Sequence, residues 1–181
     1  MFTSKFLCFV GQMDKEAITF RKARPGELED VLGLLKSAAE WLRNRNIDHW
    51  QAWLAPPPNF VNWVQRGFEN EEFHIVEADG VMIGCFRLQW EDPMFWGLRE
   101  DAAGYVHSFT ISRQRVGQGL GSKVLSLIES HCREKGKRFL RLDCNAGNFG
   151  LCRYYGSRGF RNVGETTVIG ERLILYEKSL V

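Results

Sequence analysis

The sequence has little of what marks several large classes of protein. Its 181 residues contain no segment near the ~18 consecutive apolar residues that a membrane span requires. It also lacks a charge excess, since 24 basic and 22 acidic side chains nearly balance. Domains that bind polyanions usually carry a strong basic surplus. Neither a membrane nor a nucleic acid is therefore expected as a partner.

Cysteine is scarce, and its arrangement forms no recognisable site. The five cysteines are odd in number and contain no CxxC pair: Cys8, Cys85, Cys132, Cys144 and Cys152. This pattern argues against a disulfide framework and against a zinc site, so no metal is expected. We interpret the thiols as buried structural groups of a protein in the reducing cytoplasm.

The N-terminus lacks the features of a secretory signal. The apolar run at 6–10 is too short, and no small-residue cleavage site follows it. We interpret residues 1–16 as an N-terminal extension, with Met13 as a candidate for the natural start. Residues 17–181 are expected to form a single domain.

Hydrophobic periodicity predicts the elements that are present. Alternation and turn residues predict strands, whereas an apolar stripe at helical spacing predicts helices. The predicted strands are 18–23, 73–78, 81–88, 105–111, 139–144, 160–167 and 171–179, and the predicted helices are 27–45, 60–67, 119–134 and 151–158. The expected fold class is α/β (α+β), with one mixed, mostly antiparallel sheet of about seven strands flanked by about four helices.

A glycine-rich turn joins the predicted strand at 105–111 to the helix that follows it. Gly117, Gly119 and Gly121 alternate there, so the backbone can turn tightly and approach a ligand closely. A helix N-terminus at this place suits a phosphate or pyrophosphate. The alternative is a tight turn without a ligand. The residue order differs from a Walker loop, and the GxGxG spacing differs from a dinucleotide fingerprint.

Residues 111–121, Ile-Ser-Arg-Gln-Arg-Val-Gly-Gln-Gly-Leu-Gly, resemble the coenzyme A signature [RQ]xxGx[GA] of the GNAT acetyltransferases. With the last two glycines aligned, Val116 stands where the family has Arg or Gln. A second register, starting at Gln114, matches the letters but places the helix start less well. Arg113 or Arg115 could supply the missing charge.

A second resemblance lies about thirty residues further on. Asn148, Leu151, Tyr154-Tyr155 and Gly159-Phe160 look like the family's NxxAxxxYxxxGF run, with Leu151 in place of Ala. Two motifs in this order, within a matching order of strands and helices, identify the chain as similar to the GNAT family. The resemblance implies a GNAT-like acyltransferase fold and acetyl-CoA as co-substrate.

The resemblance also implies a set of cofactor-binding residues. The end of the strand at 105–111 would bind the pantetheine arm and offer a backbone donor to the oxyanion, and Asn148 would hydrogen-bond the same arm. The implied set is Phe109, Thr110, Ile111, Val116, Gly117, Gln118, Gly119, Leu120, Gly121, Ser122, Asn148 and Tyr155.

The family's chemistry implies direct attack of a neutral amine on the thioester in a ternary complex. Tyr155 is the candidate general acid, because a phenol can give its proton to the departing thiolate; the alternative is a tyrosine that only packs on the coenzyme. His107 is the candidate base and shares a face with Phe109 by strict alternation, although a strand histidine is often merely hydrogen-bonded. Glu100 and Asp101 are the other candidates for the base.

Tryptophans dominate the segments expected to border the acceptor. Trp50, Trp53 and Trp96 are predicted to contact the substrate, and Asp48 and His49 lie beside the first of them. These rings favour a small amine with an apolar body or cation–π capture of its ammonium form, unless they only pack helices onto the sheet. The alternatives are a protein or peptide N-acetyltransferase and a non-catalytic coenzyme A-binding module. A homodimer is common for such folds.

Overall fold

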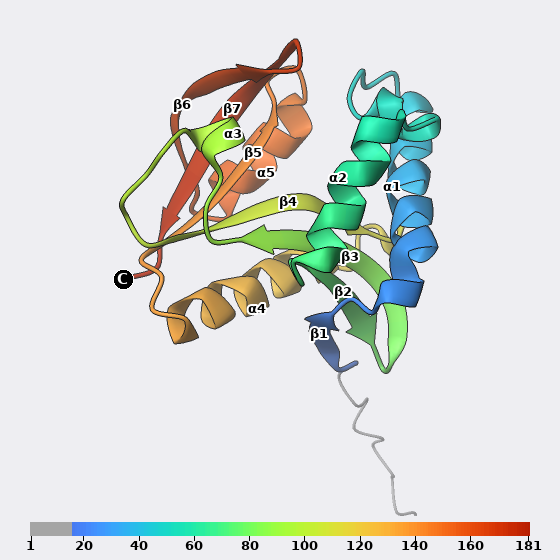
Figure 1. Cartoon of the computed structure of the whole chain (residues 1–181), viewed down its shortest axis with the longest axis horizontal. Coiled ribbons are helices and arrows are strands. Elements are labelled where there is room, and N and C mark those ends of the chain that lie inside the picture. The colour runs from blue at the N-terminus through green and yellow to red at the C-terminus, as the bar shows by residue number, and fades with distance from the viewer. Residues whose placement is uncertain (1–15) are drawn as a thin grey trace, which may run out of the picture.

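A computed structural model of the chain describes residues 16–181 and places seven strands in one sheet (Figure 1). The strand order is β1-β2-β3-β4-β5-β7-β6, and β4–β5 is the parallel pair of an otherwise antiparallel ladder. The strands are β1 (Ile18–Lys22), β2 (Phe73–Ala78), β3 (Val81–Gln89), β4 (Ala103–Ile111), β5 (Phe139–Asn145), β6 (Arg161–Val168) and β7 (Glu171–Ser179). The predicted fold class is confirmed. Except for Glu16, the predicted extension at 1–16 lies outside the described residues.

Five α-helices accompany the sheet: α1 (Leu28–Arg43), α2 (Pro58–Glu69), α3 (Pro93–Trp96), α4 (Leu120–Glu134) and α5 (Phe149–Ser157). The 3₁₀ turns η1 (Pro25–Glu27), η2 (Gln51–Leu54) and η3 (Arg113–Arg115) join them. The single-turn α3 lies in the segment between β3 and β4, where the Asp92 carboxylate accepts a hydrogen bond from the Phe95 amide. Within 16–181, every helix is too short or too polar to cross a membrane.

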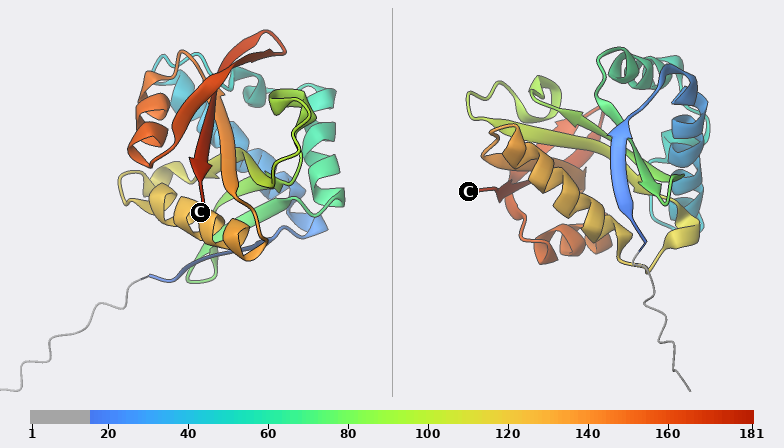
Figure 2. Two further views of the ribbon diagram at one scale, coloured as in Figure 1. Left: turned by 90° about the vertical axis from the view of Figure 1, so that its left-hand side faces the viewer. Right: turned by 90° about the horizontal axis from the view of Figure 1, so that it is seen from below.

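The helices cover the two faces of the sheet separately. α1 and α2 pack on one face through a cluster that includes Val31, Val64 and Phe73, whereas α4 and α5 pack on the other through Val124 and Tyr155. Figure 2 shows α4 on the opposite side of β1 from α1 and α2. The buried thiols Cys85, Cys132 and Cys144 belong to these clusters, in agreement with the prediction for them.

Strands β4 and β5 pair only at their N-terminal ends. Their parallel register runs from Ala103↔Phe139 to Val106↔Leu142 and then stops, although both strands continue. The two parts of the sheet therefore separate toward the C-terminal ends of β4 and β5. On the other side of β4, Gly84 of β3 allows close approach, since a Cβ there would lie 2.4 Å from the Thr110 carbonyl oxygen.

Replacing Gly84 by alanine should destabilise the protein. The added Cβ would overlap the Thr110 carbonyl oxygen and the Ile111 side chain, and overpacking of this kind costs about 1–3 kcal/mol in the free energy of unfolding. Urea denaturation measures the change. Gly33→Ala is the matched control, because that α1 glycine has open space around its Cβ and alanine favours a helix by up to about 1 kcal/mol. Equal effects of the two substitutions would contradict the close approach.

Candidate functional site

A β-bulge near the end of β4 determines which side chains face each side of the sheet. The register moves from Cys85↔Thr110 to Arg87↔His107, so β4 advances three residues where β3 advances two, and Ser108 takes a positive φ of 52°. Phe109 therefore packs with the cluster beneath α4, whereas His107 contacts Trp63 and Phe95 on the opposite face. The expectation that His107 and Phe109 share a face is wrong, because the bulge interrupts strict alternation.

A cleft of about 610 Å³ opens where β4 and β5 separate. All of the predicted cofactor-binding residues except Gln118 line it. The Gln118 side chain instead accepts a hydrogen bond from Arg115 at 2.7 Å. The second wall of the cleft comes from α1 and the segment after it: Ala38, Trp41, Leu42, Ile47, His49 and Trp50. The cleft therefore joins the glycine turn to an apolar, aromatic wall.

The glycine turn presents backbone to this cleft. Gly117 and Gly119 have φ of 84° and 70°, in the left-handed region that favours glycine, and Gly119 is the N-cap of α4. The first amides of α4 thus point at the cleft with the positive end of the helix dipole behind them. Val116, at the Arg/Gln position of the motif, is 53% exposed and its side chain cannot donate a hydrogen bond, so the groups that this part of the turn offers to an anion are backbone N–H groups.

Asn148 and Tyr155 are held at the other side of the cleft by α5. Asn148 is the N-cap of this helix, and its side-chain oxygen accepts from the Leu151 amide at 3.1 Å. The capping role leaves the side-chain NH₂ to donate to a ligand. Tyr155 packs against Tyr154, Phe160 and Tyr176. Burial raises the pKa of Tyr155 well above its usual value, so its hydroxyl stays protonated.

His107 lies between two buried carboxylates rather than in the cleft. Its Nε2 is 2.9 Å from Asp92 Oδ2, and its Nδ1 is 3.5 Å from Asp143 Oδ1. Burial alone would lower the pKa of His107, but the hydrogen bond to Asp92 and the charge of Asp143 outweigh it and raise the pKa. Burial raises the pKa of Asp143, against the charge of His107. The three groups form a cluster in which an imidazolium is stabilised, and none of them lines the cleft.

The other candidate bases lie in less suitable places. Asp101 pairs with Arg141, whose hydrogen bond lowers the pKa of that carboxyl. Glu100 is exposed in the loop before β4. His49 does line the cleft, and burial lowers its pKa to about 4, so its imidazole is neutral at ordinary pH.

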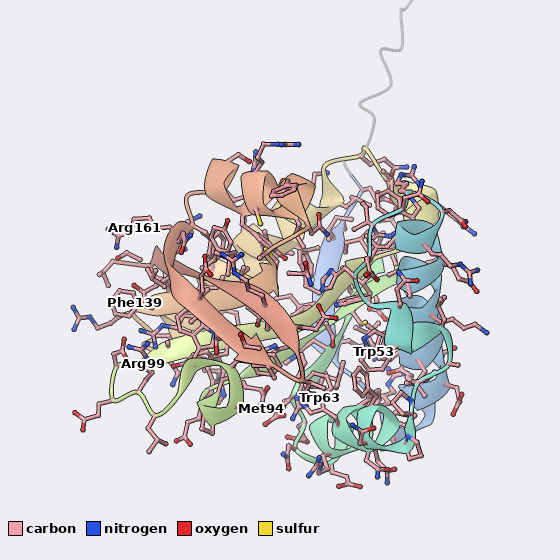
Figure 3. All side chains as sticks on the ribbon, turned by 90° about the horizontal axis from the view of Figure 1, so that it is seen from above. Trp53, Trp63, Met94, Arg99, Phe139 and Arg161 are labelled. Carbon is pink, nitrogen blue, oxygen red and sulfur yellow. The ribbon has the colours of Figure 1, made fainter. Side chains whose placement is uncertain are left out.

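The three tryptophans predicted to contact the substrate separate in the structure. Trp50 lines the cleft. Trp53 is 7% exposed in the core under α1 and α2, and Trp96 is 4% exposed against Tyr105. Trp53 is seen beside the helices in Figure 3, which also shows Trp63 of α2 near Met94 of α3. Packing of the helices onto the sheet thus accounts for Trp53 and Trp96, and the structure does not bring them to the cleft.

Sequence reasoning missed Asp92 and Asp143, the carboxylates that flank His107. Asp143 stands within the apolar run of β5, and an acidic residue at that place is the signal that could have found it. Asp92 gives no such signal, because it lies in a polar loop and is brought to His107 only by the fold. Within residues 16–181, no group of His, Cys, Asp and Glu is arranged to hold a metal ion.

Comparison with known proteins agrees with this architecture. Residues 35–160 match the model of the acetyltransferase (GNAT) family. An uncharacterized N-acetyltransferase of Bacillus subtilis (strain 168), YesJ, is 27% identical over 143 residues, which is 76% of this chain and 78% of YesJ.

Solved structures show the same fold. A GNAT-family acetyltransferase of Listeria monocytogenes superposes with a TM-score of 0.73 at 26% identity, covering 90% of this chain and 94% of that one. The protein yncA of Salmonella typhimurium, solved with its cofactor acetyl-CoA, superposes with a TM-score of 0.60 at 19% identity, covering 91% and 95%.

The His107 cluster should make stability depend on pH. Because the folded-state pKa of His107 is raised, its contribution is complete below the ordinary imidazole pKa of about 6.5 and is lost as pH rises through the folded value. His107→Gln should abolish this slope. It should also cost about 3 kcal/mol near pH 6.5, since it leaves two buried carboxylates without a cation.

Urea unfolding across this pH range measures both effects. The penalty of His107→Gln should shrink in acid, where Asp143 can take up a proton because its pKa is raised. His131→Gln is the control, since that α4 histidine forms no ion pair within the described part of the chain. An unchanged slope in His107→Gln would show that the imidazole is not charged in the folded protein.

Proposed function

The chain belongs to the acetyltransferase (GNAT) family, and from this premise we propose that it moves the acetyl group of acetyl-CoA to the primary amine of a small molecule. The observation that carries the proposal is the cleft beside the end of β4. It joins a phosphate-binding helix terminus, an amide and a phenol on α5, and an aromatic wall on α1. A wall formed by α1 and the segment after it suits a compact acceptor better than an extended peptide.

The residues present fit acetyl-CoA. The pyrophosphate would lie on the amides of Gly119, Leu120 and Gly121 at the start of α4, where charge and hydrogen bonding both favour it. Gly121 faces Tyr154 closely, with the Tyr154 hydroxyl 3.0 Å from the position of an added Cβ, so a larger residue would narrow this part of the cleft. The binding of acetyl-CoA by yncA, a protein of the same fold, supports the assignment.

The end of β4 supplies the groups for the pantetheine arm and the thioester. Beyond Val106 the backbone of β4 has no β5 partner, so peptide groups at 109–111 are available for hydrogen bonds to a ligand. A backbone N–H there can stabilise the oxyanion that forms when the amine attacks. The Asn148 NH₂ can donate to the same arm from the opposite side.

The reaction requires two proton movements. The amine nitrogen bonds to the acetyl carbon, the carbon–sulfur bond breaks, and the sulfur leaves as a thiolate. Tyr155 donates its hydroxyl proton to that sulfur in our proposal. Burial raises the pKa of Tyr155, so its hydroxyl keeps its proton until the thiolate forms.

The amine proton passes to the Asp92–His107–Asp143 cluster, through a water molecule since these groups lie behind the cleft wall. His107 acts here as part of a charged unit. The carboxylate of Asp143 is the group in the unit that can still accept a proton, because its Oδ1 has no hydrogen-bond partner within residues 16–181 and its pKa is raised. The negative charge of Asp143 also contributes to the raised pKa of Tyr155.

Gly119→Ala should weaken acetyl-CoA binding. An alanine in the left-handed region costs about 1–2 kcal/mol, so the free turn should relax and the coenzyme should bind roughly 5- to 30-fold more weakly. Isothermal titration with acetyl-CoA measures the affinity. The control is Gly136→Ala, at the other end of α4 with the same φ of 70° and open space around it. Equal losses of affinity would mean that the turn does not bind the coenzyme.

Tyr155→Phe should lower kcat for acetyl transfer by about 10²- to 10⁴-fold, because the thiolate loses its proton donor. The affinity for acetyl-CoA should change little, since the ring remains. Release of free thiol from acetyl-CoA across a panel of amines measures turnover. Tyr176→Phe is the control, since this neighbouring core tyrosine donates to the Cys152 carbonyl and lies outside the cleft lining. Coenzyme binding without thiol release from any amine or peptide would favour a non-catalytic module.

A further inference from the structure

The cleft carries arginine side chains and no carboxylate. Arg113 and Arg115 are among its lining residues, whereas no aspartate or glutamate of the described chain is. Arg115 is neutralised, because it pairs with Glu16 and also donates to the Gln118 side chain. Arg113 forms no ion pair with any residue in 16–181. The charge of the cleft is therefore concentrated at Arg113.

The guanidinium of Arg113 has neutral partners and a cationic neighbour. Its Nε donates to the Ile111 carbonyl at 2.8 Å, and its Nη2 donates to the Thr110 hydroxyl at 3.3 Å. It lies 5.2 Å from the ring centre of Trp41, and the guanidinium of Arg45 lies 3.8 Å from the same centre. Burial and the nearby Arg45 charge lower the pKa of Arg113. An anion placed here would relieve the repulsion between the two cations.

The position of Arg113 separates it from the phosphate-binding turn. Phe109 and Ile111 pack beneath α4, so Thr110 between them points to the other face, the one covered by α1. Because Arg113 donates to Thr110 and lies over Trp41 of α1, its charge is on the α1 side of the cleft. The helix terminus that suits pyrophosphate belongs to α4, on the opposite side.

We infer that the acetyl acceptor carries an anionic group, a carboxylate or a phosphate, that pairs with Arg113. The inference rests on the proposed function and specifies its substrate class. Trp41, Leu42, Ile47 and Trp50 line the same cleft with apolar surface, so the acceptor also has an apolar body. Trp41 is already covered by guanidinium groups, which leaves it unsuited to capture the ammonium of the acceptor.

Paired probes test the inference in the native protein. Binding of benzoate against benzamide, and of phenyl phosphate against phenol, is measured by isothermal titration with coenzyme A present and absent. A charge-assisted hydrogen bond should favour the anionic member of at least one pair by about 10- to 100-fold. The pair that shows the preference distinguishes carboxylate from phosphate. Equal affinity within both pairs would overturn the inference without any substitution.

Substitution of Arg113 tests whether this residue causes the preference for the anionic probe. Arg113→Gln should remove the preference for the anionic probe, whereas Arg113→Lys should keep part of it because the charge remains without the planar fork. Arg43→Gln is the matched control, since this exposed arginine on the last turn of α1 makes the same change in net charge. Thermal melting of each variant shows that it is folded. A preference that persists in Arg113→Gln would contradict the inference.

The affinity of the Arg113→Gln variant for coenzymes tests whether Arg113 binds the acceptor or the cofactor. Acetyl-CoA and 3′-dephospho-acetyl-CoA should each bind Arg113→Gln as they bind the native protein, within about threefold. A tenfold or greater loss for acetyl-CoA in this variant would assign Arg113 to the coenzyme and overturn the inference. Failure of acetyl-CoA to bind the native protein would instead count against the proposed function, and the anion probes measured without coenzyme would still test Arg113.

Discussion

β4 and β5 are hydrogen-bonded in parallel from Ala103 to Val106 on β4, and the rest of the site depends on where this pairing stops. A parallel ladder that ended with the strands would leave no space between them. Because it ends early, peptide groups of β4 remain unpaired at the position where a ligand with amides of its own can pair with them. The start of α4 and residues of α5 both line the cleft at this end of β4.

The bulge at Ser108 determines which side chains of β4 face each side of the sheet. Upstream of it, His107 points toward α2 and α3 and meets two carboxylates in the protein interior. Downstream, Phe109 and Ile111 pack beneath α4, and Thr110 faces α1. Without the extra residue, the side chains that follow it along β4 would point to the opposite faces of the sheet.

Local patterns predicted most of the fold and most of the residues that line the cleft around the glycine turn. The glycine turn follows from the spacing of its residues, whereas Asn148 and Tyr155 are found through the resemblance of their segment to the family motif. The Asp92–His107–Asp143 cluster could not be predicted in this way, because its members come from three segments that only the tertiary fold brings together. The burial of Trp53 and Trp96 likewise depends on how α2 and α3 pack. The sequence does not distinguish an aromatic residue of the core from one that lines a cleft.

The charged groups around the cleft bear on how the proposed acceptor would be oriented in it. In the cluster around His107, two acidic side chains flank one imidazole, an arrangement that favours positive charge between them. The α1 wall holds Arg113 and Arg45 without an acidic partner in the described chain, and it attracts an anion. In a cavity partly excluded from water these fields are weakly screened. In our proposal, an acceptor with an amine at one end and an anion at the other is therefore oriented before it contacts the thioester, with its nitrogen toward the cluster that we propose as the proton acceptor.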